Sequence, residues 1–578
     1  MERVRQIFLA LALLALMSAG ALAQTSQRGT GGAAATVDER ATDAAITVLE
    51  LGGNAIDATV AAAAVLGVTD PFSAGLGGGG FILIYNAESG NVVSIDGRET
   101  APLAATPDMF MDGDSAIPFG ERRGSSLSVG VPGTLASWQV ALDRYGTMDL
   151  GTLLQAGVRI AEVGFEVDET FASQIAGNAE RFSVFPDTAQ LYLPGGAPPE
   201  VGSTFANPDL AASYRLIAEQ GIDVFYQGEI GEDIVATVQS PVTVAEPPYE
   251  VRSQDMTMAD LELYHAPVRQ ASHVEYRGYD VYGMGSPSSG GYTIGLILNI
   301  LETMDLGAMD TADALHAMLE ASRLAYSDRG AYMGDSDFVN VPVVGLQSDE
   351  FAATRAALIG EEAGDNPAPG DPFQFQEVGS PPLMPPQSAD DEGMSTSHIT
   401  VADRFGNVVA YNITIESTGG SGMLVPGRGF LLNNELTDFN AGPGTANSVQ
   451  PGKRPRSSMA PTIILQGGEP FLALGSPGGS TIITTVLQTA LNVIDFGMTP
   501  EEAMAAPRMS QRNSSNTTAE AGFDAEVIAD LEARGHSFSD TSEIGAATLI
   551  YFNDDGSMTA VAEPVRRGSG SARVVQPE

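Results

Sequence analysis

The 578-residue sequence contains no cysteine. Disulfide bonds, thiolate nucleophiles and sulfur ligands for metals are therefore excluded together, and packing alone must hold the fold. Lysine is almost as scarce, because Lys453 is the only lysine among 28 basic residues. Against these stand 73 acidic residues, giving a formal net charge of −45, which disfavours nucleic-acid and anionic membrane partners. Excess carboxylate with so little lysine also suits a protein that works at high salt.

Histidine is scarce too, and the familiar hydrolase motifs are missing. No Gly-x-Ser-x-Gly segment occurs, and the histidines lack the His-Glu-x-x-His spacing of a zinc protease. The glycine run Gly75–Gly80 follows an expected helix and precedes an expected strand, which reverses the order that a dinucleotide-binding loop requires. We expect no metal and no cofactor. The five histidines are His265, His273, His316, His398 and His536.

The length and the 43% hydrophobic content are sufficient for a large α/β protein. At the start, two arginines within residues 1–6 precede the apolar run Ile7–Gly20 and the small residues Ala21 and Ala23. This is the pattern of a secretory signal peptide, expected over residues 1–23. The apolar run is shorter than a membrane span, so we expect a protein that is secreted or periplasmic, without a membrane anchor.

The periodicity of apolar residues predicts mixed secondary structure. Residues 44–68 read as helix with an interruption at Gly52–Asn54, and residues 81–85 and 92–95 read as short buried strands. Residues 147–235 read as mostly helical, and residues 312–332 read as one further helix.

A proline-rich tether over residues 363–394 leads into a predicted hairpin. Thr396–Asp403 and Val408–Glu416 read as its strands, joined by a turn at Arg404–Asn407. A short turn would bring Thr414 to Glu416 opposite Thr396, with the register uncertain by one residue. Asn412, Thr414 and Glu416 share one face of the second strand, so the hairpin places polar side chains beside Thr396.

Thr396 is the most informative candidate for catalysis. An internal threonine is an ordinary alcohol, whereas an N-terminal threonine combines a hydroxyl nucleophile with an amine that can take its proton. Such an amine has a pKa of about 8, which suits a base at neutral pH. We therefore expect a chain that cleaves itself between Ser395 and Thr396. His398, two residues further on, is expected to be structural.

A second candidate element is Gly478 and Gly479, between a strand at residues 471–474 and a helix that begins near Thr481. Free backbone N–H groups at such a helix start can stabilise an oxyanion. A tight turn that needs glycine explains the same residues. The residues alone favour the tight turn.

Taken together, the sequence resembles the gamma-glutamyltranspeptidases, members of the N-terminal-nucleophile hydrolases, from about Ala41 to Ala562. The matching segments, in order, are Leu51–Asp57, Gly75–Gly80, Asp96–Pro102, Thr396–His398, Leu432–Glu435 with Asp438, Lys453–Met459 and Gly475–Gly479.

The resemblance implies an α/β fold, an αββα sandwich built from two autoprocessed subunits. The large subunit would span residues 24–395 and the small subunit residues 396–578, and the two would remain together as a heterodimer. Thr396 would be the nucleophile and Thr414 would orient it.

By the same resemblance, Arg98 would bind the substrate's α-carboxylate with help from Ser457 and Ser458. Glu435 and Asp438 would bind its α-amino group. The resemblance also favours Gly478 and Gly479 as the oxyanion hole. Glutathione is the expected donor, and water or amino acids are the expected acceptors.

Two departures and two alternatives accompany this hypothesis. Glu416 stands where many family members carry asparagine, and it would either tighten ammonium binding or alter the acyl preference. Residues 440–451 are short beside the lid loop of some members, which predicts an open pocket. The alternatives are a cephalosporin or glutaryl acylase of the same fold, and an unprocessed protein that binds γ-glutamyl compounds.

Overall fold

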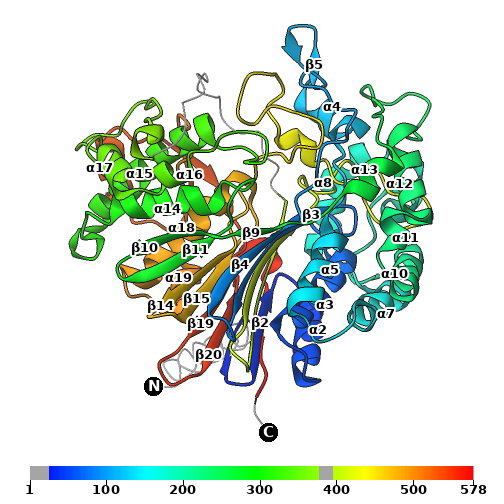
Figure 1. Ribbon diagram of the computed structural model, residues 1–578, viewed down its shortest axis with the longest axis horizontal. Coiled ribbons are helices and arrows are strands. Elements are labelled where there is room, and N and C mark those ends of the chain that lie inside the picture. Colours follow the sequence, from blue (N-terminus) through cyan, green and yellow to red (C-terminus); the bar gives the residue numbers. More distant parts are fainter. Residues whose placement is uncertain (1–24, 377–394, 577–578) are drawn as a thin grey trace, which may run out of the picture.

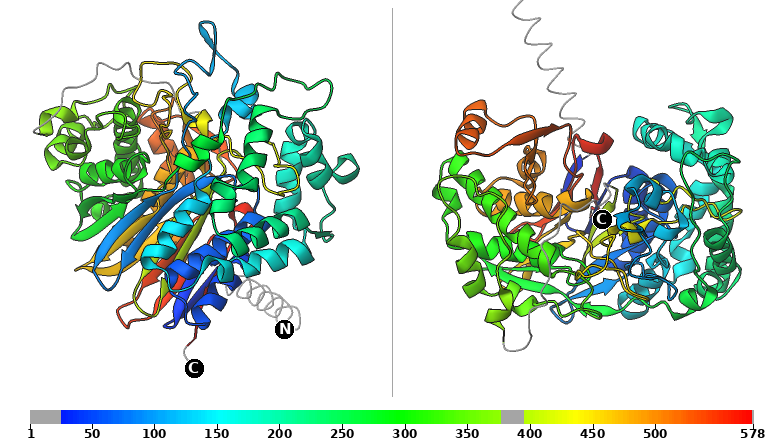
Figure 2. Two further views of the ribbon diagram at one scale, coloured as in Figure 1. Left: turned by 45° about the vertical axis from the view of Figure 1, so that its right-hand side comes forward. Right: turned by 90° about the horizontal axis from the view of Figure 1, so that it is seen from above.

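A computed structural model describes residues 25–376 and 395–576. The expected signal peptide and residues 377–394 of the expected tether lie outside the described residues. Two antiparallel sheets of seven strands each stack face to face, and helices cover the outer face of each sheet (Figures 1 and 2). This is the αββα arrangement that the sequence predicted.

The two sheets are built from strands distant in sequence. The first sheet contains, in spatial order, β1 (Ser26–Gly29), β20 (Met558–Ala562), β19 (Thr548–Phe552), β15 (Glu469–Gly475), β14 (Thr462–Gln466), β11 (Tyr279–Gly283) and β10 (Ser272–Tyr276). The second contains β21 (Ser571–Val574), β2 (Gly32–Thr36), β12 (Ser397–Asp403), β13 (Val408–Thr414), β3 (Gly79–Asn86), β4 (Asn91–Asp96) and β9 (Val268–Gln270).

Helices pack on both outer faces. Against the second sheet lie α2 (Glu39–Glu50), α3 (Ala55–Thr69) and α5 (Thr134–Tyr145). Further helices extend this layer, namely α4 (Phe119–Arg123), α6 (Leu150–Leu153), α7 (Gln155–Val163), α8 (Glu169–Phe182), α9 (Pro186–Tyr192), α10 (Pro208–Gln220), α11 (Asp223–Tyr226), α12 (Glu229–Gln239) and α13 (Met258–Leu263). Covering the first sheet are α14 (Gly290–Leu301), α15 (Thr311–Tyr332), α16 (Val343–Leu346), α17 (Asp349–Ala356), α18 (Ile482–Ile494), α19 (Pro500–Ala505) and α20 (Ala525–Ala533).

Short strands complete the described elements. β5 (Met111–Asp112) pairs with β6 (Ser115–Ala116), and β7 (Phe165–Glu166) pairs with β8 (Thr204–Phe205). A three-stranded sheet contains β16 (Met509–Ser510), β17 (Thr517–Glu520) and β18 (Phe538–Thr541).

The alternation of side chains along each strand divides the core into layers. In β3, Leu83 and Tyr85 face the first sheet, whereas Ile82 and Ile84 pack among the helices on the other side. Successive side chains of a strand point to opposite faces, so one apolar strand serves two cores. This explains why residues 81–85 form a continuous buried run.

The helix interruption expected at Gly52–Asn54 is confirmed, because α2 ends at Glu50 and α3 begins at Ala55. The Asn54 side chain accepts hydrogen bonds from the first turn of α3, and the Asp57 carboxylate accepts one from the Asn54 backbone N–H. This capping box satisfies N–H groups that a helix start leaves free.

Residues on both sides of Thr396 contribute to both sheets. β12, β13 and β21 follow Thr396, yet they pair with β2 and β3, which precede it. In the first sheet, β1 pairs with β20 and β11 pairs with β14. The two segments are therefore interlocked through backbone hydrogen bonds.

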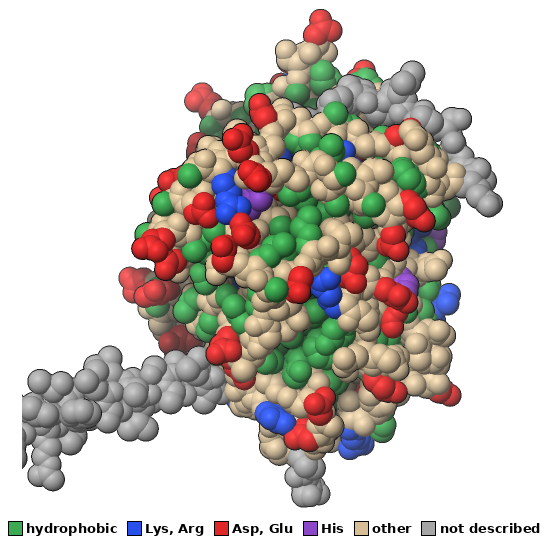
Figure 3. Space-filling view, turned by 90° about the vertical axis from the view of Figure 1, so that its left-hand side faces the viewer, with side chains coloured by type: hydrophobic (Ala, Val, Ile, Leu, Met, Phe, Trp, Pro, Cys, Tyr) green, Lys and Arg blue, Asp and Glu red, His purple; other side chains and the backbone are tan. Residues whose placement is uncertain are grey.

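The surface is acidic, in keeping with the composition. Figure 3 shows carboxylate side chains spread over one face of the molecule, with few basic ones among them. Within residues 25–376 and 395–576, no helix has both the length and the apolar character to cross a membrane.

Candidate active site

The predicted site residues gather around one pocket. Every predicted site residue lines it except Gly478, which adjoins the lining residue Gly479. The lining residues are Arg98, Ser395, Thr396, Thr414, Glu416, Glu435, Asp438, Ser457, Ser458, Met459, Gly479 and Ile482. The lining combines the guanidinium of Arg98 with the carboxylates of Glu416, Glu435 and Asp438, so it carries charges of both signs.

The β12–β13 hairpin positions Thr396 beside Thr414. Ser397 pairs with Ile413, so the expected register is confirmed and the next pair along the strands is Thr396 with Thr414. The two hydroxyl oxygens are 3.4 Å apart. The first strand, β12, starts at Ser397, one residue later than expected. The second strand, β13, ends at Thr414, two residues earlier than expected.

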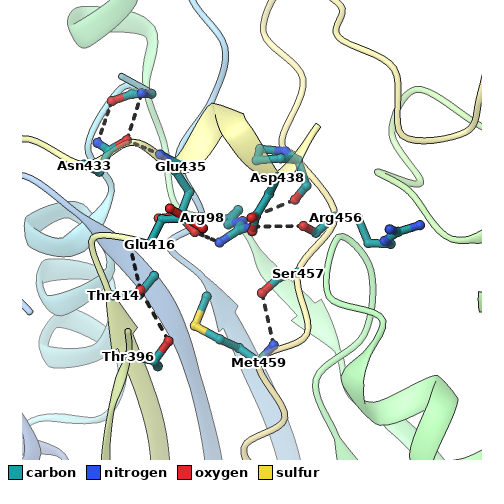
Figure 4. A network of polar contacts seen from close by, with 12 residues as sticks. Arg98, Thr396, Thr414, Glu416, Asn433, Glu435, Asp438, Arg456, Ser457 and Met459 are labelled. Atoms are coloured by element: carbon teal, nitrogen blue, oxygen red, sulfur yellow. Dashed lines mark hydrogen bonds and ion pairs between the residues drawn. The ribbon is translucent and has the colours of Figure 1, made fainter. Parts of the chain in front are cut away.

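The carbonyl oxygen of Ser395 is the focus of this arrangement. It accepts hydrogen bonds of 2.8 Å from the hydroxyls of both Thr396 and Thr414. The Thr414 hydroxyl also accepts a bond of 2.9 Å from the backbone N–H of Glu416. Thr414 is therefore held with its proton directed at the Ser395 carbonyl. Figure 4 shows Thr414 between Thr396 and Glu416.

Arg98 lies at the base of the pocket with its guanidinium between two carboxylates. It forms ion pairs with Glu435 and, at 2.5 Å, with Asp438, and it also donates to the carbonyls of Pro455 and Arg456 at 3.2 and 2.9 Å. The Arg98 side chain is only 1% exposed. Figure 4 shows it beside Glu435 and Asp438. A positive and a negative charge side by side provide complementary partners for a zwitterion.

Glu416 has an unusual backbone conformation, with φ of +77°. Its carboxylate accepts hydrogen bonds from the side chains of Ser417 and Asn434. A non-glycine residue with positive φ is uncommon and persists where its surroundings fix it. The carboxylate is therefore held in the wall of the pocket, on the same strand end as Thr414.

Ser457 and Ser458 form another part of the wall. The Ser458 hydroxyl accepts a bond of 2.7 Å from Arg329, and the Ser457 hydroxyl accepts a bond of 3.1 Å from the N–H of Met459. In both bonds the serine oxygen is the acceptor, so each hydroxyl proton is available to a ligand.

Gly478 and Gly479 have φ of +137° and +56°. Gly479 begins a 3₁₀ turn, Gly479–Thr481, that leads directly into α18, as the sequence predicted. A Cβ on Gly478 would lie 2.6 Å from the Thr481 hydroxyl. The turn itself therefore requires glycine, while the position of Gly479 in the pocket wall is compatible with an oxyanion hole.

The loop at residues 440–451 is fixed by Lys453, the single lysine. Its ammonium donates to the carbonyls of Ala446 and Ser448 at 2.7 and 2.9 Å. Within this loop, the Asn447 side chain donates to the Asp438 carbonyl at 2.6 Å. Lys453 thus contributes indirectly to the position of Asp438.

Burial shifts the pKa values of two titratable groups, His398 and Glu99. Burial lowers the pKa of His398 to about 3, and the imidazole contacts Asn412 at 3.1 Å. A neutral, buried histidine of this kind supports the structural role expected for it. Burial raises the pKa of Glu99, next to Arg98, to about 8, so this carboxyl is mostly protonated at neutral pH.

Sequence reasoning missed a polar network behind Thr396. Arg567 donates to the Thr396 carbonyl at 2.5 Å and forms an ion pair of 3.0 Å with Asp70. Asp70 accepts a bond from the Ser397 hydroxyl, and Ser73 bonds to the Ser395 hydroxyl at 2.7 Å. Local sequence carried no signal for this network, because the contacting residues are 171 to 497 positions apart.

In the described part of the chain, no group of three or more His, Asp or Glu residues is arranged to hold a metal ion.

Comparison with known proteins identifies the family. The sequence model described as Gamma-glutamyltranspeptidase matches residues 41–573. A "Glutathione hydrolase proenzyme" from Bacillus subtilis (strain 168) is 39% identical over 547 residues, covering 94% of this chain and 91% of that protein. The chain belongs to the gamma-glutamyltranspeptidase family.

Acylases are also among its relatives. An "Acylase ACY 1 proenzyme" from Pseudomonas sp. (strain V22) is 35% identical over 562 residues, covering 94% of this chain and 95% of that protein. The crystal structure of cephalosporin acylase from Bacillus halodurans matches with a TM-score of 0.84 and 26% identity, covering 96% and 98% of the two chains. The fold is therefore that of the N-terminal-nucleophile hydrolases.

Proposed function

We propose that this protein is a gamma-glutamyltransferase and glutathione hydrolase that matures by cleaving its own Ser395–Thr396 bond. The observation that carries the proposal is the Ser395 carbonyl, which accepts 2.8 Å hydrogen bonds from Thr396 and Thr414 within the pocket. The names of its family relatives as glutathione hydrolase proenzymes support both the activity and the maturation.

Self-cleavage follows from this geometry. The Thr396 hydroxyl attacks the Ser395 carbonyl carbon, the amide C–N bond breaks, and an ester forms between Ser395 and the Thr396 oxygen. Water then hydrolyses the ester. The products are a carboxylate on Ser395 and a free amine on Thr396.

The liberated Thr396 then acts on substrate. Its amine takes the hydroxyl proton while the oxygen attacks the γ-carbonyl of a γ-glutamyl amide. The leaving amine departs with a proton, and an acyl-enzyme ester remains. Water releases glutamate, or the amine of an amino acid or peptide takes the γ-glutamyl group.

Charge explains why a γ-glutamyl group suits the pocket. Its α-carboxylate pairs with the guanidinium of Arg98, assisted by the free protons of Ser457 and Ser458. Its α-ammonium replaces Arg98 as a partner of Glu435 and Asp438. A zwitterionic ligand therefore exchanges an internal ion-pair network for an equivalent one.

Gly478 and Gly479 would stabilise the oxyanion formed from the γ-carbonyl. Loss of one such donor typically costs about 3 kcal/mol of transition-state stabilisation. Their place at the start of α18 supports this role, since free N–H groups concentrate at a helix start.

The mature enzyme would be a heterodimer of residues 24–395 and 396–578, after removal of the signal peptide on export. The shared sheets described above support a stable complex, because separating the segments would break backbone pairing between β12 and β2 and between β13 and β3. Glutathione is the expected donor.

A second candidate is an acylase for glutaryl or cephalosporin side chains. The structural match to a cephalosporin acylase and the similarity to Acylase ACY 1 favour it. A glutaryl group lacks the α-ammonium and would leave Glu435 and Asp438 without that partner. The pocket therefore favours γ-glutamyl.

The proposal is tested by purifying wild-type protein, Thr396→Ala and Thr396→Ser and determining their intact masses. We expect two chains divided before Thr396 in the wild type, slower division with serine, and one undivided chain with alanine. Only divided protein should release the aniline from a γ-glutamyl anilide. An alanine variant that matures and turns over this substrate would refute the mechanism.

A further inference from the structure

Two arginines of this acidic chain, Arg123 and Arg181, lie near each other without a carboxylate partner within the described residues. Arg123 ends α4 and Arg181 lies in the last turn of α8 (Figure 1). In the described ranges neither has a carboxylate oxygen within 4.0 Å. Arg181 is buried and Arg123 is half-buried. Several buried arginines do have such partners, namely Arg98, Arg355, Arg454, Arg508 and Arg566.

Arg181 is only 5% exposed, yet two of its three side-chain nitrogens lack hydrogen-bond partners. One terminal nitrogen donates to Asn178 at 2.6 Å and to the Thr418 carbonyl. Its Nε and its other terminal nitrogen have no partner. Burial and the nearby Arg123 guanidinium lower the pKa of Arg181 to about 9. Unpaired buried donors are costly, and an anion that accepted hydrogen bonds from them would remove this cost.

Further unpaired donors lie close to Arg181. The Nε of Arg123 and the hydroxyl of Tyr249 are buried without hydrogen-bond partners. The Tyr249 hydroxyl packs against Gly124, since a Cβ there would lie 2.3 Å from it. Burial raises the pKa of Tyr249 although both arginines oppose this, so the hydroxyl remains a donor.

The carboxylates that act electrostatically on this group are Glu180 and Glu416. Neither forms an ion pair with Arg123 or Arg181 within the described residues. Glu416 is already held by Ser417 and Asn434. The cluster of Arg123, Arg181 and Tyr249 therefore retains an excess of positive charge and hydrogen-bond donors.

The cluster lies next to the proposed catalytic pocket. Arg181 bonds to the carbonyl of Thr418, two residues beyond Glu416 in the pocket wall. Two residues of extended chain span at most about 7 Å. The leaving group of glutathione is also two residues long, with a carboxylate at its far end.

We propose that Arg123, Arg181 and Tyr249 form a carboxylate subsite that binds the C-terminal carboxylate of the leaving or accepting peptide. The planar guanidinium groups match the two oxygens of a carboxylate, and the tyrosine hydroxyl adds a third donor. Donor and acceptor peptides share the subsite because the acceptor enters where the leaving group departed. This inference rests on the proposed γ-glutamyl transfer.

The test compares two donors that differ only in this charge, glutathione and its glycine carboxamide. For each mature enzyme, kcat/KM is measured for both donors by glutamate release, and the ratio is taken. The ratio is internal to each preparation, so a smaller fraction of active enzyme in one variant cancels. The variants are Arg123→Gln, Arg181→Gln and Tyr249→Phe, with Arg159→Gln on the exposed face of α7 as the matched control.

We expect the wild type and Arg159→Gln to prefer glutathione about tenfold, as one lost charge-assisted bond would produce. Arg123→Gln and Arg181→Gln should bring the ratio close to one, and Tyr249→Phe should lower it less. If Arg181→Gln does not mature, the kcat/KM ratios of Arg123→Gln and Tyr249→Phe test the subsite. A wild-type ratio of one, as for a cluster that binds only inorganic anions, or a ratio unchanged by these variants would overturn the subsite. A wild type that hydrolyses neither donor would instead contradict the proposed function.

Discussion

Replacing Thr414 by valine should slow self-cleavage while leaving the fold in place. Valine preserves the shape of threonine and removes only the hydroxyl, which donates to the Ser395 carbonyl and accepts from the Glu416 N–H. In the proposed self-cleavage, the Ser395 oxygen becomes the oxyanion when Thr396 attacks. The hydrogen bond from Thr396 itself is lost at that moment, so the bond from Thr414 is the one that persists.

The size of the effect follows from the role of this donor. Removing a preorganised donor to an oxyanion costs roughly 3 kcal/mol, or about 10²- to 10³-fold in rate. The unpaired Glu416 N–H costs roughly 1–3 kcal/mol of stability. We therefore expect a precursor that folds but cleaves itself slowly.

The assay follows the fraction of undivided chain over time at 25 °C by denaturing gel and intact mass. Thr414→Ser, which keeps the hydroxyl, is the control and should mature within about tenfold of the wild-type rate. A melting curve establishes that the valine variant is folded. If Thr414→Val matures as fast as wild type, Thr414 does not stabilise the oxyanion and the reasoning fails.

Two further predictions concern Arg98 and its neighbour. Arg98→Lys keeps the positive charge but loses the planar fork, so KM for a γ-glutamyl anilide should rise at least about tenfold with a smaller change in kcat; an unchanged KM would exclude Arg98 from binding the α-carboxylate. Glu99 has its pKa raised from 4.5 to about 8 by burial, so between these pH values the folded state binds a proton that the unfolded state does not. The free energy of unfolding therefore falls as pH rises, by about 1.4 kcal/mol per pH unit. Glu99→Gln has no carboxyl at this position, so its stability lacks this dependence on pH. Between pH 5 and 8, the melting temperature of Glu99→Gln should rise relative to that of the wild type as pH increases. Parallel curves of melting temperature against pH would contradict the raised pKa.

The hairpin that carries Thr396 was predictable because its determinants are local. A four-residue turn and the alternation in β13 fix which residues lie opposite each other, and the observed register agrees. The break between α2 and α3 was predictable for the same reason, since its capping residues lie within the break.

The network behind Thr396 was not predictable, because it depends on contacts between distant segments. Arg567 reaches the Thr396 carbonyl only when β21 and β12 lie in one sheet. The raised pKa of Glu99 likewise depends on burial by several segments, which no motif encodes. The pairing of Arg98 with Glu435 and Asp438 was also unexpected, since the sequence suggested ligand roles without showing that these groups bind each other.

The most direct test of the account compares release of the aniline from a γ-glutamyl anilide and from its glutaryl analogue by the mature protein. The two substrates differ only in the α-amino group that Glu435 and Asp438 are proposed to bind. Loss of charge-assisted hydrogen bonds worth roughly 3 kcal/mol predicts at least about 100-fold lower kcat/KM for the glutaryl substrate. Equal or higher rates with the glutaryl substrate would contradict the account and assign the protein to the acylases of this fold.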